Sequence, residues 1–119
     1  YTVLDLQLTY QEIADLRKAT DIFINLPMSD QFSASMQETI YAGGIVITGN
    51  WLPYDTFWKE GVKAVKIDDF SELKSVLLQV IRNLDEIRKD LPGNKDKIWK
   101  LSSWENTVNS WLNLYDLTD

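Results

Sequence analysis

Residues 21–48 constrain the fold most, because two short apolar runs enclose a polar loop and a helix-like stretch. Residues 21–26 form a continuous apolar run that is too short for a globular helix and predicts a buried parallel strand. Residues 33–41 predict the helix that follows, and residues 45–48 predict a β-branched strand. A strand, a helix and a strand in this order predict an α/β fold with a Rossmann-like parallel sheet flanked by helices.

Local signals mark the ends of two helices. Thr9 and Glu12 have the spacing of a capping box, in which each side chain bonds the backbone N–H of the other residue, and the helix should run to about Lys18. Gly43 or Gly44 can take the left-handed conformation that ends the helix over residues 33–41. We therefore expect both helices to be short.

Further strands are predicted on both sides of this unit. Residues 1–6 predict a short strand, and residues 62–67 predict another. Between the strands, residues 49–54 predict a loop that faces the same crevice as the polar loop, with aromatic side chains that line it or pack beneath it. A short helix over residues 55–60 should end at Gly61.

The rest of the chain predicts two long helices. Asp69 and Glu72 cap the first, and residues 91–94 end it. Its apolar residues recur with a helical period of about 3.6 residues; they are Leu73, Val76, Leu77, Val80, Ile81, Leu84 and Ile87.

The second long helix, a closing helix over residues 102–119, starts with a Ser102–Glu105 capping box. Its apolar stripe comprises Trp104, Val108, Trp111, Leu112 and Tyr115. Such a stripe usually packs in a core, but it would be exposed and would favour self-association if a partner domain were missing.

Composition excludes several kinds of chemistry. The chain of 119 residues has the size of one domain and contains neither Cys nor His, which rules out disulfides, thiolate nucleophiles, the usual zinc sites and imidazole-based triads. Its net charge of −6 argues against nucleic acid as the main partner. The chain begins at Tyr1 and lacks a stretch long enough to span a membrane, so we expect one partial domain of a cytoplasmic protein that acts at or near the inner membrane surface.

The polar loop and the helix after it form the candidate site. In an open α/β sheet, ligands bind outside the carboxyl ends of the strands, where the next helix directs its free N–H groups. Asp30 lies in this loop and Glu38 on the helix, so two carboxylates can accept hydrogen bonds from separate hydroxyls of one ligand. The backbone N–H groups of Ser33, Ala34 and Ser35 suit phosphate oxygens. A nucleotide sugar offers both kinds of group.

At these residues the chain resembles the C-terminal, donor-binding half of the GT-B glycosyltransferases, in the large retaining family called glycosyltransferase group 1. The resemblance covers most of the chain. In that family a strand ending in Pro leads to a Glu, seven residues, a second Glu, a helix ending in Ala-x-Gly and a strand, and a later helix often starts with Ser-Trp-Glu. The matching segments here are Pro27, Asp30, Glu38, Ala42-Gly43-Gly44, Ile45-Val46-Ile47 and Ser103-Trp104-Glu105.

The resemblance implies a donor-binding fragment that is inactive without an N-terminal acceptor-binding domain. The parent enzyme would transfer a sugar from a nucleotide diphosphate sugar to a glycan, lipid or protein, with no resident cofactor and no metal. Asp30 would be the catalytic residue that holds the sugar, and Glu38 would hold the ribose. The donor-binding set is Gln31, Phe32, Ser33, Ala34, Ser35 and Glu38.

The departures from the family pattern fall within the site. Asp30 replaces a Glu and is one methylene shorter, so it needs a closer loop or a bridging water to reach a sugar. Gln31-Phe32-Ser33 replaces Gly-Phe-Gly, which removes backbone freedom next to phosphate, although Ser33 and Ser35 can offer hydroxyls. The basic pair that holds the diphosphate in the family lies earlier in the domain, and no residue before Asp30 clearly supplies it.

Two other readings remain open at this point. The same departures fit a glycosyltransferase-like subunit that has lost catalysis and serves as a binding or assembly partner. The alternation of strands and helices also fits an unrelated flavodoxin-like or receiver-like domain. The sequence gives this last reading little support, because no acidic cluster follows the first strand and no phosphate-binding loop is visible.

Overall fold

The computed structural model describes residues 1–115 and has an α/β fold with a small open sheet of three parallel strands flanked by helices. The strands are β1 (Ile22–Asn25), β2 (Ile45–Gly49) and β3 (Val65–Ile67), and they lie in the order β1-β2-β3. Ile24 pairs with Ile47 in the register of β1 and β2. The predicted parallel sheet is confirmed, and this arrangement is compatible with a Rossmann-like fold.

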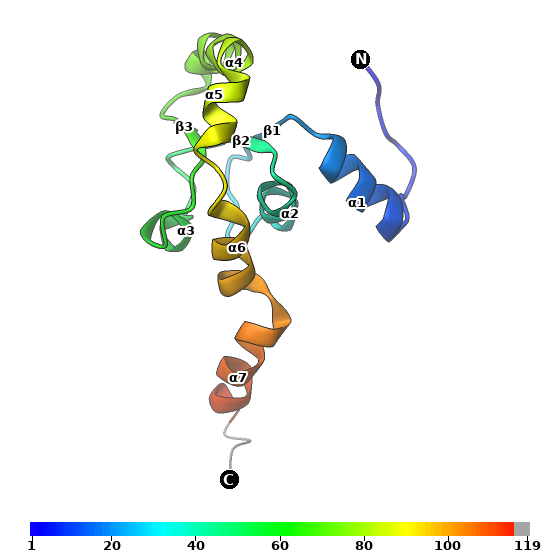
Figure 1. Cartoon of the computed structure of the whole chain (residues 1–119), viewed down its shortest axis with the longest axis vertical. Coiled ribbons are helices and arrows are strands. Elements are labelled where there is room, and N and C mark those ends of the chain that lie inside the picture. The colour runs from blue at the N-terminus through cyan, green and yellow to red at the C-terminus, as the bar shows by residue number, and fades with distance from the viewer. Residues whose placement is uncertain (116–119) are drawn as a thin grey trace.

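Two apolar clusters cover the two faces of the sheet. On one face, helices α2 (Ala34–Ala42), α3 (Asp55–Lys59) and α6 (Asn94–Ser102) contribute side chains to a cluster that includes Met36 and Val46. On the other face, α4 (Leu73–Arg82) and α5 (Leu84–Lys89) pack over the alternate side chains of β2. Figure 1 shows this layering, with β2 between the two sets of helices. Because both faces of β2 are covered, all five of its residues are buried.

The prediction that residues 21–26 form a buried strand is only partly correct. The strand is parallel, but β1 lies at the edge of the sheet, and only Asn25 is buried. The side chain of Ile24 is 41% exposed, because the apolar cluster on its face includes Ile22 and Leu26 but not Ile24. A short continuous apolar run cannot tell an edge strand from a central one, since that depends on the neighbouring strands.

The predicted strand over residues 1–6 is wrong, whereas the helix that follows is confirmed. Residues 1–6 form no strand, and their side chains are exposed, because no sheet edge pairs with them. Helix α1 (Tyr10–Ala19) begins with the expected capping box: the Thr9 N–H donates to Glu12 Oε2 at 2.8 Å, and the Glu12 N–H donates to Thr9 Oγ1 at 3.3 Å. Figure 1 shows α1 and the N-terminal residues beside α2 rather than over the sheet.

The middle of the chain follows the prediction with one correction. Gly43 ends α2 with a φ of 93°, and Gly61 follows α3 with a φ of 77°. The strand predicted over residues 62–67 is shorter, because Val62 leaves the sheet and packs into the cluster on the α2 face.

The cap predicted before the first long helix is confirmed only in part. The Asp69 side chain caps a single 3₁₀ turn, η1 (Phe70–Glu72), by accepting from the Ser71 N–H at 2.8 Å. Glu72 precedes α4 but makes no capping bond with its side chain.

The long helix predicted over the 73–87 region is two helices, α4 and α5, separated at Asn83. The Asn83 side-chain amide donates to the Gln79 carbonyl at 2.8 Å, and its backbone leaves helical geometry with a φ of −116°. Asparagine side chains compete in this way with the backbone bonds of a helix. Ile81, which was predicted on the apolar face, lies within α4 before the break and is 55% exposed. The end predicted at residues 91–94 is confirmed, since α5 stops at Lys89.

The C-terminal region differs most from the prediction. Helix α6 was not predicted, and Ser102 is its last residue rather than the cap of the closing helix. Helix α7 (Trp104–Leu114) begins after Ser103, and the Ser102–Glu105 capping box does not form, because the Ser102 hydroxyl donates to the Gln37 side chain on α2. The last four residues of the predicted closing helix, 116–119, lie outside the described residues.

The apolar stripe of α7 is not part of a core. Trp104 is 66% exposed and Tyr115 is 64% exposed. Figure 1 shows α7 pointing away from the sheet and its covering helices. The reading of this stripe as core is therefore wrong. Exposure was expected only for the case of a missing partner domain, and both that domain and the self-association remain predictions.

Asn94 attaches α6 to the segment before β3, and its removal should weaken the fold. Its buried side chain accepts from the Lys63 N–H and donates to the Lys63 carbonyl, both at 2.8 Å. Asn94→Ala should lower the free energy of unfolding by about 2 kcal/mol, because two backbone groups lose their partners. Urea denaturation followed by circular dichroism measures the change. The matched control is Asn109→Ala on an exposed position of α7, and an equal loss there would contradict the role of Asn94.

Candidate functional site

Asp30 lies in the loop that leaves the carboxyl end of β1, and two protein groups hold its carboxylate. Asp30 Oδ2 accepts from the Tyr54 hydroxyl at 2.8 Å, and Oδ1 accepts from the Phe32 N–H at 3.2 Å. The hydrogen bond from Tyr54, followed by that from Phe32, lowers the pKa of Asp30 below its ordinary value. Asp30 is therefore ionised at neutral pH and offers a hydrogen-bond acceptor at the mouth of the loop.

A buried polar network connects Asp30 to the end of β1. Asn25 Nδ2 donates to the Tyr54 hydroxyl oxygen at 3.2 Å, and the Ser33 hydroxyl donates to Asn25 Oδ1 at 3.1 Å. Burial raises the pKa of Tyr54, so its phenol stays neutral and can donate to Asp30.

The prediction that residues 49–54 face the loop of Asp30 is confirmed. The bond from Trp51 Nε1 to the Pro27 carbonyl, at 3.0 Å, crosses between the same two loops.

Neither the role of Asn25 nor the bond from Tyr54 to Asp30 was predicted from the sequence. The available signal was the polar Asn25 at the end of an otherwise apolar strand. A buried amide at that position needs hydrogen-bond partners, and the carboxyl end of a parallel strand is where ligands bind.

The N-terminus of α2 follows directly after this network. Ser33 is its N-cap, and the Ser33 hydroxyl accepts from the Met36 N–H at 3.2 Å. The N–H groups of Ala34 and Ser35 lie in the first turn, where a helix supplies no acceptor of its own. No acidic side chain lies in this turn to offset the positive end of the helix dipole. The arrangement suits an anion.

Glu38 lies farther along α2, on the side that faces α1. Glu38 Oε2 lies 3.2 Å from Arg17 Nε, and Arg17 Nη2 donates to Ser35 Oγ at 2.8 Å. The Arg17 guanidinium also lies 5.5 Å from the centre of the Phe23 ring. The side chain of Glu38 remains 51% exposed, so the ion pair leaves room for a ligand to approach it.

Arg17 is a second residue that the sequence analysis missed. No residue before Asp30 was predicted to supply the basic pair of the family, yet the last turn of α1 brings this cation to two predicted site residues, Ser35 and Glu38. The short connection from α1 to β1 keeps the end of α1 near the start of β1, but the sequence carries no signal that this end meets α2.

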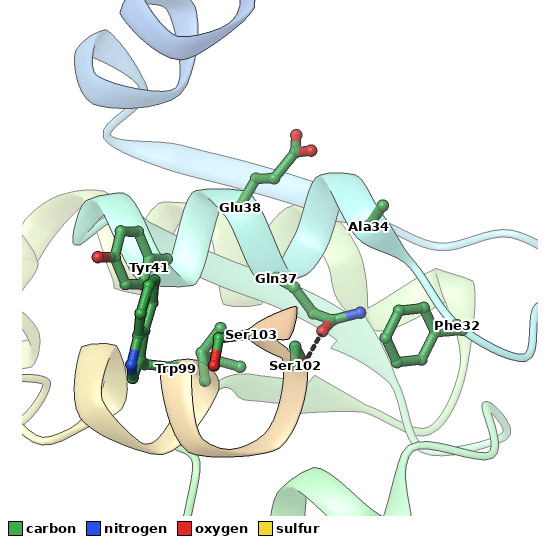
Figure 2. A pocket seen from close by; sticks show the side chains of 9 residues that line it. Phe32, Ala34, Gln37, Glu38, Tyr41, Trp99, Ser102 and Ser103 are labelled. Atoms are coloured by element: carbon green, nitrogen blue, oxygen red, sulfur yellow. Dashed lines mark hydrogen bonds between the residues drawn. The ribbon is translucent and has the colours of Figure 1, made fainter. Parts of the chain in front are cut away.

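Two hollows adjoin Glu38. A hollow of about 300 Å³ lies between α2 and α6, and one of about 480 Å³ lies between α1 and α2. Figure 2 shows Glu38 and Gln37 on opposite sides of α2, with Gln37 bonded to Ser102 and Phe32 at the end of the first hollow. The side chains that line the first hollow include Phe32, Ala34, Gln37, Glu38, Tyr41, Trp99 and Ser102.

Most of the predicted site residues, together with Asn25, Tyr54 and Arg17, therefore form two groups around the start of α2. The Asp30 group comprises Asp30, Phe32, Ser33, Asn25 and Tyr54, and the Glu38 group comprises Glu38, Ser35 and Arg17. The Ser33 hydroxyl is buried and bonded within the protein, so the expectation that it offers a hydroxyl to phosphate is wrong. The side chain of Gln31 and that of Ala34 are exposed. Among residues 1–115, no cluster of acidic side chains could hold a metal ion.

Comparison of this chain with protein-family models, with curated proteins and with solved structures found no match. In the part of the chain that the structure describes, no helix is both long and apolar enough to cross a membrane. Any function must therefore be argued from the two groups of residues around α2 and from the resemblance of the motif that contains them.

Proposed function

We propose that this chain is the donor-binding part of a GT-B glycosyltransferase and binds a nucleotide diphosphate sugar. One observation carries the proposal. An ionised carboxylate, a free helix N-terminus and a second carboxylate follow one another from Asp30 to Glu38 at the carboxyl end of a parallel strand. A sugar, a diphosphate and a ribose present the complementary groups in the same order.

The diphosphate would bind at the first turn of α2. The N–H groups of Ala34 and Ser35 can donate to phosphate oxygens, and the helix dipole favours the negative charge there. Arg17 adds a cation, because it is already bonded to Ser35 Oγ. A chain with a net charge of −6 repels anions as a whole, so local donors of this kind are needed to hold one.

Glu38 would hold the ribose and Asp30 the sugar. Glu38 uses Oε2 for Arg17, and its half-exposed carboxylate can still accept hydrogen bonds from ribose hydroxyls. Asp30 can accept from a sugar hydroxyl on the far side of the diphosphate. Placing both ends of the donor in this way would fix the bond between the sugar and the phosphate relative to an acceptor.

The proposed chemistry is transfer of the sugar to a hydroxyl or amide group of an acceptor. The bond between the anomeric carbon and the phosphate oxygen breaks, a bond to the acceptor atom forms, and the acceptor proton goes to a base. The nucleoside diphosphate leaves with the bonding electrons. The positive end of α2 and Arg17 would stabilise this developing charge, which needs no covalent step on the protein.

A non-catalytic binding subunit is the second candidate. One observation favours it: both oxygens of Asp30 already accept hydrogen bonds within the protein, from Tyr54 and Phe32. A subunit of this kind would hold the nucleotide but gain no affinity from the attached sugar. The two candidates therefore differ in how tightly the sugar conjugate binds relative to the free diphosphate.

Calorimetric titration tests the proposal directly. Uridine diphosphate, guanosine diphosphate and their sugar conjugates are titrated into the chain, and we expect one nucleotide series to bind, with the conjugate binding more tightly than the diphosphate. If the folded chain binds no member of either series, the proposal is wrong. Equal binding of diphosphate and conjugate would favour the non-catalytic subunit.

Asp30→Asn should remove the extra affinity of the sugar conjugate. Loss of the charge weakens each hydrogen bond that the side chain accepts from a sugar hydroxyl, so we expect the conjugate to bind several-fold more weakly while the diphosphate binds as before. The same titration measures both. Asp85→Asn, on an exposed position of α5, is the matched control and should change neither affinity. A fall in diphosphate affinity in Asp30→Asn would contradict a role for Asp30 that is confined to the sugar.

A further inference from the structure

We propose that Tyr54 is a positioning residue, whose hydroxyl holds the Asp30 carboxylate in the orientation that receives a sugar hydroxyl. The inference rests on the proposed function, and it assigns a role to a residue outside the motif that suggested that function. The geometry that points to it is a rigid, buried ring whose one polar atom reaches the partly exposed loop of Asp30.

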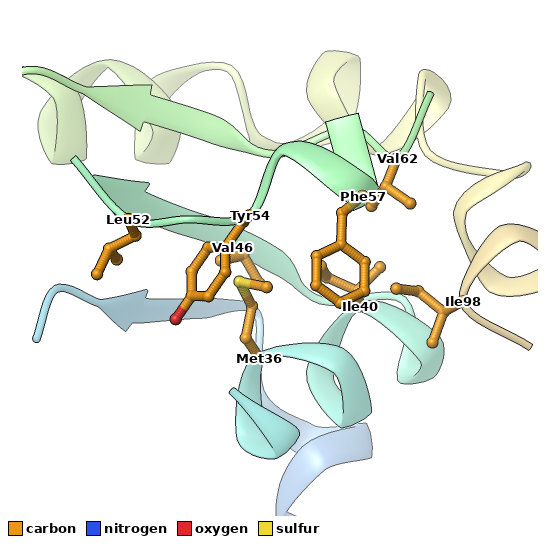
Figure 3. Close-up of a cluster of buried hydrophobic side chains, with 8 residues drawn as sticks. All are labelled: Met36, Ile40, Val46, Leu52, Tyr54, Phe57, Val62 and Ile98. Atoms are coloured by element: carbon orange, nitrogen blue, oxygen red, sulfur yellow. The ribbon is translucent and has the colours of Figure 1, made fainter. Parts of the chain in front are cut away.

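The ring of Tyr54 is immobile because of its surroundings. It is 1% exposed and belongs to the apolar cluster on the α2 face of the sheet. Its centroid lies 6.2 Å from that of Phe57 in an edge-on arrangement. Figure 3 shows the ring above Met36, with its hydroxyl directed away from Phe57. Close packing of this kind leaves a side chain one position.

The hydroxyl is also fixed in direction. It has one proton to donate, and its oxygen accepts from Asn25 Nδ2 at 3.2 Å. The proton therefore goes to Asp30 Oδ2, at 2.8 Å. Asn25 is in turn held by the Ser33 hydroxyl at 3.1 Å, so the orientation of the phenol is set by the end of β1 and the cap of α2.

Asp30 needs such a support because its own loop does not provide it. The carboxylate has one local bond, from the Phe32 N–H at 3.2 Å, and no ion pair within residues 1–115. A free carboxylate would lose side-chain entropy on binding a sugar. A carboxylate already held by Tyr54 has lost that freedom before the ligand arrives, which is preorganisation.

The carboxylate keeps acceptor capacity for the ligand. Two carboxylate oxygens have about four acceptor positions, and Tyr54 and Phe32 occupy one on each oxygen. One position therefore remains on each oxygen, which suits two neighbouring hydroxyls of a sugar ring. The shorter reach of Asp30 compared with a Glu is offset by this fixed orientation.

Tyr54→Phe removes the hydroxyl and keeps the ring, so the core stays filled. The three proteins to compare are the unchanged chain, Tyr54→Phe and the control Tyr115→Phe, which removes a hydroxyl from a residue that is 64% exposed just after α7. Calorimetry measures binding of uridine and guanosine diphosphates and of their sugar conjugates. Carbon-13 NMR of the Asp30 carboxyl measures its pKa, which the Tyr54 hydroxyl lowers most and the Phe32 N–H lowers next.

We expect Tyr54→Phe to weaken binding of the sugar conjugate about tenfold, with the diphosphate unchanged and the pKa of Asp30 raised toward its ordinary value. Equal losses for conjugate and diphosphate would show that the hydroxyl serves only the fold. A raised pKa with unchanged affinities would show that Tyr54 holds Asp30 but that no sugar uses it. Either result overturns the inference. If the unchanged chain binds no conjugate, the proposed function and the role of Tyr54 toward a sugar are both wrong, whatever pKa is measured for Asp30.

Discussion

Ile47→Ala should lower the free energy of unfolding by about 4 kcal/mol. Ile47 is 0% exposed in the central strand and packs against Ile45, Ile67 and Val80. Truncation removes three carbon atoms from a site closed by β3 and α4, so the loss of apolar burial adds to the cost of a cavity. Urea denaturation followed by circular dichroism measures the change.

The matched control for this substitution is the neighbour of Ile47 in the sheet. Ile24 is its register partner on β1, and the side chain of Ile24 is 41% exposed. Ile24→Ala should cost less than about 1.5 kcal/mol, because part of its surface already meets water. Equal costs at the two positions would mean that β1 is covered in solution and is not an open edge.

Glu38→Ala should weaken binding of the nucleotide diphosphate by about 1.5–3 kcal/mol, because the ribose hydroxyls lose a charged acceptor. This corresponds to roughly a 10- to 150-fold rise in Kd. Calorimetry with uridine and guanosine diphosphates measures it. Asp30→Asn should leave the same affinity unchanged, so Glu38→Ala weakens both diphosphate and conjugate, whereas Asp30→Asn weakens only the conjugate.

The control for Glu38→Ala must also lose an ion pair on the surface. Glu60→Ala does so, because Glu60 Oε2 lies 3.1 Å from Lys100 Nζ at a half-exposed position away from α1. Exposed pairs of this kind contribute about 0–1 kcal/mol to stability, and we expect no effect on binding. Unchanged affinity in Glu38→Ala would reject the ribose role, and a matching loss in Glu60→Ala would show that the effect is nonspecific.

The parts of the fold that the sequence predicted depend on interactions between near neighbours. The capping box of Thr9 and Glu12 joins residues three positions apart, and Gly43 ends α2 through its own backbone conformation. The parallel sheet follows from β-branched runs on either side of a helix-like segment. Where a competing local bond or a distant partner intervened, the prediction failed: Asn83 splits a helix through Gln79, and Ser102 bonds to Gln37 on α2 instead of capping α7.

The candidate site divides in the same way. The sequence by itself determined that Asp30, the start of α2 and Glu38 follow the end of one strand, because these groups lie on a continuous segment. Only the tertiary structure decided what holds them. Tyr54 reaches Asp30 across 24 residues of chain, and Arg17 reaches Glu38 across 21. Contacts at such separations depend on how β2 and α1 pack against α2, and side-chain packing leaves no periodic signal in a single sequence.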